Sequence, residues 1–270
     1  MRKIKISIKV LLLLFGLMLV VSLIEAHEFW LQPKKYRYML GEEVKVDFMV
    51  GESFTGEYWD LARHKAEKME LHRASGVEDL VKEVKSTKGN NLSVKADQEG
   101  TYLLAMQSNA AYIEMEGKEF NAYLKEDGLD NILNERKKLN QLEKPSTEYY
   151  TRYVKLLVQV GDKKDDSYKK KVGLRYEIIP DQNPYTLKTG DHLQCNVFFE
   201  GKPAPHALVK VWNKVNNTTF MQNIYTENDG SIRFPISTSG EWMVSSVKMI
   251  KSETEGAQYH SLWASLVFGI

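Results

Sequence analysis

Short segments that mix apolar and polar residues recur along the chain, and turn-forming residues separate them. The segments are rich in Val, Phe, Tyr and Trp, and several alternate apolar with polar positions, as β-strands with one buried face do. Gly, Asn and Asp lie in the breaks between them. This spacing is typical of antiparallel β-sandwiches and differs from that of βαβ units. The expected strands cover residues 43–50, 101–107, 154–160, 193–199, 207–212, 242–250 and 261–268.

One stretch has a helical period instead. Residues 120–143 carry apolar residues at helical spacing in two runs, which the pair Asp127-Gly128 interrupts. Asp130 stands where it can cap the second run. The pattern therefore predicts a helical insertion made of two pieces.

A charged run, DKKDDSYKKK at 162–171, divides the chain. It reads as a solvated linker or loop, so we expect an N-terminal β-domain at 27–165, which contains the helical insertion, and a C-terminal β-sandwich at 172–270. The order of strands and turns in the second half is that of small Ig-like or prealbumin-like modules. Asp229-Gly230 is its best hairpin signal. The predicted fold class is mainly β, with two antiparallel sandwiches.

The first 26 residues differ from the rest. Basic residues precede an apolar run from Val10 to Ile24, and Ala26 supplies a small residue at the expected cut. This is the layout of a secretory signal peptide, and the run is shorter than the roughly 20 residues of a permanent membrane helix. An uncleaved anchor is the alternative. We expect a periplasmic or secreted protein whose mature chain begins at His27.

Composition excludes several functions. The formal net charge of +1 offers no field for nucleic acid, and the single cysteine, Cys195, cannot form an intramolecular disulfide or a thiolate zinc cluster. Its apolar context favours a buried structural thiol. The chain contains no GxSxG, P-loop or GxGxxG motif. The sequence therefore predicts a non-enzymatic protein with no organic cofactor and no evident small-molecule substrate.

Successive blocks of the chain resemble one bacterial family whose members carry a domain of unknown function. The blocks are HEFWLQP at 27–33, GESFTGE at 51–57, FNAYLKEDGLD at 120–130, RYVKLLVQVGD at 152–162, LRYEIIPDQNPYTLKTGD at 174–191, GKPAPHALVKVW at 201–212, GEWMVSSVKM at 240–249 and SLWASLVF at 261–268. Members are often described as periplasmic components of nickel or cobalt uptake. The resemblance implies a secreted, all-β accessory protein of metal uptake, with a membrane metal transporter as its partner.

Cleavage after Ala26 would give His27 a free α-amine. That amine and the imidazole of the same residue can chelate one Ni²⁺ or Co²⁺ ion, and Cu²⁺ is not excluded. One more imidazole would complete a brace for copper. The alternative is that His27 merely starts an edge strand.

The second ligand is harder to name. Relatives commonly carry His where this chain has Lys248, and a protonated lysine repels a metal cation. His260 would come near Lys248 if residues 242–250 and 259–268 form a hairpin, so His260 is the candidate substitute. The alternative is an exposed loop histidine. We therefore predict a metal site formed by His27 and His260.

Other interpretations stay open at this point. An envelope structural or interaction protein without a metal role is the main alternative, and a copper-dependent oxidative enzyme is another. Glu52 and Glu57 could be carboxylate ligands or solvated residues of a turn. A sugar-stacking platform could be built from Trp30, Tyr36, Tyr38, Tyr58 and Trp59, although tryptophans in such domains mostly fill the core.

Overall fold

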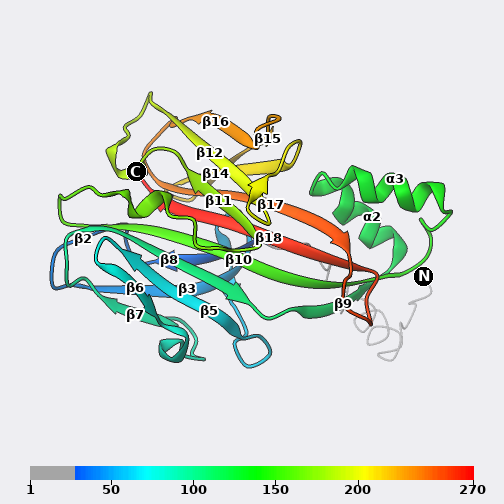
Figure 1. Ribbon diagram of the computed structural model, residues 1–270, viewed down its shortest axis with the longest axis horizontal. Helices are drawn as coiled ribbons and strands as arrows, with labels where there is room; N and C mark the ends of the chain where they lie inside the picture. Colours follow the sequence, from blue (N-terminus) through cyan, green and yellow to red (C-terminus); the bar gives the residue numbers. More distant parts are fainter. Residues whose placement is uncertain (1–27) are drawn as a thin grey trace, which may run out of the picture.

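The computed structural model describes residues 28–270, and within that range the strands form three stacked sheets (Figure 1). A ten-stranded sheet lies between two four-stranded sheets. The central sheet contains, in order, β15 (Thr218–Tyr225), β14 (Leu208–Val215), β17 (Glu241–Lys251), β18 (Tyr259–Gly269), β10 (Ser146–Val160), β8 (Gly100–Ser108), β5 (Ala66–Arg73) and β6 (Gly76–Asp79), with β2 (Arg37–Tyr38) and β9 (Ala111–Met115) also on β10. The first outer sheet contains β1 (Glu28–Pro33), β3 (Glu43–Glu52), β4 (Thr55–Tyr58) and β7 (Leu92–Lys95). The second contains β11 (Tyr176–Pro180), β12 (His192–Phe199), β13 (Lys202–Pro203) and β16 (Ser231–Pro235).

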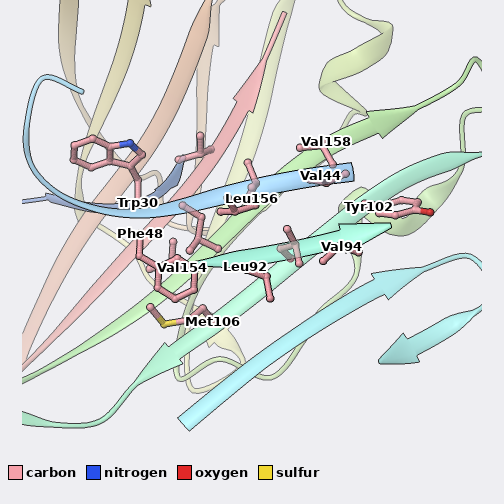
Figure 2. Packing of buried hydrophobic residues seen from close by; sticks show 14 of the residues in the cluster. Trp30, Val44, Phe48, Leu92, Val94, Tyr102, Met106, Val154, Leu156 and Val158 are labelled. Carbon is pink, nitrogen blue, oxygen red and sulfur yellow. The ribbon is translucent and has the colours of Figure 1, made fainter. Parts of the chain in front are cut away.

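The central sheet packs against an outer sheet on each face, so its strands contribute side chains to two hydrophobic cores. Successive side chains of a strand point to opposite faces, so Val154, Leu156 and Val158 of β10 pack under the first outer sheet, whereas Tyr153 and Leu157 pack under the second. Figure 2 shows the first of these cores, where β10 residues meet side chains of β1, β3 and β7. Because both faces of β10 are buried, apolar residues occupy both odd and even positions along it. The prediction of a mainly β protein is confirmed.

A parallel pair joins the two halves of the chain. β10 and β18 run side by side from Glu148 opposite Tyr259 to Leu156 opposite Val267. The two predicted domains therefore contribute strands to one sheet, and their independence stays a prediction. The charged run between them carries η2 (Asp166–Lys169), and the other short 3-10 helices are η1 (Val81–Glu83) and η3 (Pro184–Thr186).

The helical insertion lies where the sequence predicted it. Helices α2 (Gly117–Glu126) and α3 (Asp130–Lys138) are separated at Asp127-Gly128, and they cover one end of the central sheet (Figure 1). The predicted cap is wrong, because Asp130 is the first helical residue and makes no capping hydrogen bond. Among residues 28–270, no helix is both long and apolar enough to cross a membrane.

One of two hairpin predictions is correct. β17 and β18 form the expected antiparallel hairpin, with Ile250 opposite His260. The turn at Asp229-Gly230 instead carries the chain between sheets, since β15 pairs with β14 and β16 pairs with β12. Gly230 has the positive φ of 79° that the turn signal implied. The residues Asp229-Gly230 therefore do form a turn, but a turn does not determine which strand the following strand pairs with.

Candidate functional site

A pocket of about 280 Å³ opens between the end of the first outer sheet, helix α2 and strand β10. Its walls are largely aromatic, and five rings line it: Tyr58, Trp59, Tyr123, Tyr150 and Trp263. The ionisable side chains that line it are Glu57, Asp60, His64, Glu148 and Arg152. Aromatic walls with a few converging polar groups are the usual make-up of a ligand pocket.

Strand periodicity aims the β10 residues into this pocket. Glu148, Tyr150 and Arg152 alternate along β10 and therefore share one face. Trp263 of β18 and Tyr123 of α2 join them, and their rings stack at 5.7 Å with an interplanar angle of 10°. These rings form a rigid floor because sheet and helix both hold them.

The mouth of the pocket is formed by the segment after β4. The imidazole of His64 stacks on Trp59 at 5.0 Å and 7°. Burial, followed by the positive charge of Arg152, lowers the pKa of His64. His64 is therefore neutral at pH 7 and adds no positive charge to the mouth.

Arg152 is buried under aromatic rings. Its guanidinium lies 5.4 Å from the ring centre of Phe29, 5.5 Å from that of Tyr150 and 5.7 Å from that of Trp263. Such cation–π contacts offset part of the cost of burying a cation. Burial lowers the pKa of Arg152 below its ordinary value. Arg152 is thus the cation of the pocket floor.

Glu148 is the most perturbed acid of the pocket. It is buried, and its Oε1 accepts a hydrogen bond of 3.1 Å from Ser261, whose Oγ accepts in turn from Trp263 Nε1 at 2.9 Å. Its Oε2 and the hydroxyl of Tyr123 are buried and lack a hydrogen-bond partner among the described residues. Burial raises the pKa of Glu148 to about 8, against the opposing effect of Ser261. Glu148 is therefore mostly protonated at pH 7.

A second buried ionic group lies at the start of β1. Lys210 of β14 bonds Asp127 at 2.7 Å and lies 3.9 Å from Glu28. Asp127 Oδ2 is buried and lacks a partner among the described residues. Burial raises the pKa of Asp127 to about 7 although Lys210 opposes it, and burial also raises the pKa of Glu28. Two buried acids thus share one lysine.

The structure describes one of the two predicted metal ligands. His27 lies outside the described residues, but a peptide bond joins it to the buried Glu28. His260 is half-buried, its Nε2 lies 2.9 Å from Thr151 Oγ1, and it stands on the face of the central sheet opposite the one that β1 covers. Within residues 28–270, no three His, Cys, Asp or Glu side chains form a metal-binding group.

The other candidate residues from the sequence lie in the hydrophobic core, in a turn or against a single aromatic ring. Lys248 lies over the ring of Phe199 at 4.7 Å, and burial lowers its pKa. Cys195 is buried, as expected. Glu52 lies at the end of β3 in the β3–β4 turn. Trp30, Tyr38 and Trp59 are core residues rather than an exposed sugar platform.

Sequence reasoning missed Tyr123, Asp127, Glu148 and Arg152. A signal was present for two of them, because TEYYTRYV at 147–154 places Glu148 and Arg152 at even spacing on one strand face. Charged residues at such positions mark a buried polar site once the strand is known to be central. The expected strand began at residue 154, so both lay outside it.

A family model described as "Domain of unknown function (DUF4198)" matches residues 24–249. The chain belongs to this family. The family description names neither a metal nor a transporter. No curated protein matches the sequence of this DUF4198 protein.

Solved structures give weak likenesses. Trypsin-activated α2-macroglobulin from Escherichia coli matches with 11% identity and a TM-score of 0.22, over 90% of this chain and 15% of that one. A tetra-tandem repeat from a large adhesion protein matches with 10% identity and a TM-score of 0.20, over 90% and 49%. This DUF4198 chain therefore spans a small part of the α2-macroglobulin, and scores this low carry no argument about function.

Proposed function

We propose that this DUF4198 protein is an exported, non-enzymatic accessory protein of transition-metal uptake, with Ni²⁺ or Co²⁺ as its cargo. It would carry the ion on an Ig-like or prealbumin-like scaffold and pass it to a membrane metal transporter. The binding residue is His27, as the first residue of the mature chain. Cu²⁺ would be accepted by the same nitrogen donors.

The observation that supports this proposal is the pair of buried acids beside His27. Glu28 and Asp127 share Lys210 as their ion-pair partner, and Arg152 also acts on Glu28 electrostatically. Asp127 Oδ2 also lacks a hydrogen-bond donor among the described residues. Buried charges are normally paired, and an unpaired one is costly. A cation next to Glu28 would remove this cost.

The proposed ligands suit a transition-metal ion. The α-amine and the imidazole of His27 would supply two nitrogen donors. We propose Asp127 Oδ2 as the third ligand, because it is buried without a hydrogen-bond partner among the described residues and Asp127 shares Lys210 with Glu28. Nitrogen and carboxylate donors are accepted by Ni²⁺, Co²⁺ and Cu²⁺. The chain would bind and release the ion without chemical change.

His260 stays a separate prediction as a ligand. Its ring lies on the other face of the central sheet, and Thr151 occupies its Nε2. His260 would therefore have to exchange Thr151 for a metal ion in order to act as a ligand through Nε2. A metal titration of His260→Ala tests this directly, since a true second ligand would weaken binding about as much as the loss of His27.

The experiment starts with export of the full precursor from a bacterial host and intact mass of the product. A chain that starts at His27 should bind one equivalent of Ni²⁺ or Co²⁺ by calorimetry. His27→Ala should lose that binding, whereas His192→Ala, at an exposed strand position, should keep it. A chain that starts at His27 and binds none of Ni²⁺, Co²⁺ and Cu²⁺ would refute the proposal.

A second function, an envelope interaction protein without a metal role, has one observation in its favour. β15 forms an edge of the central sheet, has no charged residue in TTFMQNIY, and exposes Phe220, Met221 and Tyr225. Uncharged edge strands can add a strand from a partner. Recovery of a membrane partner by wild type and not by Met221→Lys, with no metal binding, would favour this function.

A further inference from the structure

The aromatic pocket has the form of a pre-built slot for a flat apolar group. Tyr123 stacks on Trp263, and His64 stacks on Trp59, so rings on two sides are already fixed by their neighbours. The cavity of about 280 Å³ is large enough for a one- or two-ring compound. When the walls of a site are already fixed, binding costs little conformational entropy, so little affinity is lost.

The floor of the slot carries two buried polar groups with which a ligand could pair. Glu148 Oε2 and Tyr123 Oη are buried, and neither has a hydrogen-bond partner among the described residues. Leaving such buried polar atoms unpaired costs free energy. Both residues line the pocket. A ligand that brings N–H donors to this floor would recover that cost.

The charges of the pocket favour a positive ligand. Two lining acids, Glu57 and Asp60, stand against one described cation, Arg152, and Glu148 is neutral in the empty pocket but can give up its proton when a cation binds beside it. The guanidinium of Arg152 lies against the rings of Phe29 and Tyr150, which interact with part of its charge. Electron-rich ring faces attract ammonium groups, and this attraction is stronger where the contact is shielded from water.

We infer that this pocket binds a small organic cation, an amine that carries a flat ring. The ammonium group hydrogen-bonds Glu148 Oε2 and Tyr123 Oη, and the ring lies among Trp59, Tyr150 and Trp263. This site goes beyond the metal site proposed at His27, because it uses neither His27 nor Asp127. An acceptor at Glu148 also explains why a carboxyl group is kept in so apolar a place.

The test compares ligands that share a ring and differ in charge. Tryptamine, 3-methylindole and indole-3-acetate are titrated into the exported protein at pH 7 by calorimetry, and phenethylamine serves as a smaller amine. We expect one equivalent of at least one amine to bind, at least about tenfold more tightly than 3-methylindole. Indole-3-acetate should bind most weakly. Equal affinity for the three indoles, or no binding of either amine, would overturn the inference.

Variants locate the site. Glu148→Gln keeps the shape of the side chain but cannot ionise when an ammonium group binds, so amine affinity should fall at least about tenfold. Glu114→Gln is the matched control, since Glu114 is exposed on β9 between the lining residues Ile113 and Met115 and points away from the pocket. Amine binding by Glu148→Gln at the wild-type level would contradict the assignment, and circular dichroism would show that the variant is folded.

The two proposals fail separately. His27→Ala should lose Ni²⁺ binding and keep amine binding, whereas Glu148→Gln should do the reverse. Loss of amine binding in both variants would place the amine at the metal site and overturn the inference. Absence of Ni²⁺ binding with a normal amine titration would refute the metal function alone.

Discussion

Glu148 should make the protein less stable as the pH rises, and Glu148→Gln should remove that effect. The folded state holds the proton of this carboxyl up to a pKa of about 8, whereas its ordinary pKa is 4.5. An acid with a raised pKa binds more protons folded than unfolded, so its contribution is fully present below pH 4.5 and is lost as the pH rises to about 8. Each pH unit in this window removes about 1.4 kcal/mol. The whole window is worth roughly 3–5 kcal/mol.

Urea unfolding of both proteins, followed by tryptophan fluorescence from pH 5 to pH 9, measures this contribution. The difference in free energy of unfolding between Glu148→Gln and wild type should be near zero at pH 5 and should reach about 3–5 kcal/mol in favour of the variant at pH 9. The comparison cancels the titration of other carboxyls, which both proteins share. A difference that does not change with pH would refute the reasoning. The same variant should lose amine binding, so stability and binding would be opposed at this residue.

Three further predictions concern the scaffold. Lys155 and Glu177 form a buried ion pair between the central and second outer sheets. Lys155→Ala should therefore lower the free energy of unfolding, measured with urea, by about 3–5 kcal/mol. The double variant Lys155→Met with Glu177→Leu should recover most of that loss. Gly128 has φ +67°, and an added Cβ would lie 2.6 Å from Leu208 Cβ. Gly128→Ala should therefore lower the melting temperature by at least several degrees. An unchanged melting temperature would count against this packing. Burial raises the pKa of the Cys195 thiol, so a thiol reagent should label it after unfolding and not before; rapid labelling of the native protein would contradict its burial.

The sequence predicted local structure well because local structure depends on period. All seven expected strands are present, and the two helical runs break at Asp127-Gly128 as their apolar spacing indicated. Pairing was predicted less well. The parallel contact of β10 with β18 joins residues more than a hundred positions apart, and no turn residue signals it. For the same reason, the turn at Asp229-Gly230 did not reveal that β16 pairs with β12 instead of with β15.

The site was less predictable than the fold for a related reason. Glu148 and Asp127 became candidates because sheet and helix bury them beside Tyr123 and Lys210, which lie far from them in sequence or on another element. In the sequence each is an ordinary acid among many. His27 is a candidate because of the chemistry of a free amine, which does not depend on the fold. Pairing His27 with His260 would require knowing which face of its strand each residue occupies, and residue spacing alone does not give that.

A Ni²⁺ titration of Asp127→Asn tests the central claim most directly. The claim is that the buried acids beside Glu28 are balanced by a cation bound at the mature N-terminus. Calorimetry on the exported protein should give one equivalent for wild type and at least about tenfold weaker binding for Asp127→Asn, with the variant still folded because Asn keeps a hydrogen-bond acceptor for Lys210. Equal affinity of wild type and Asp127→Asn, or no Ni²⁺ binding by either, would contradict the account.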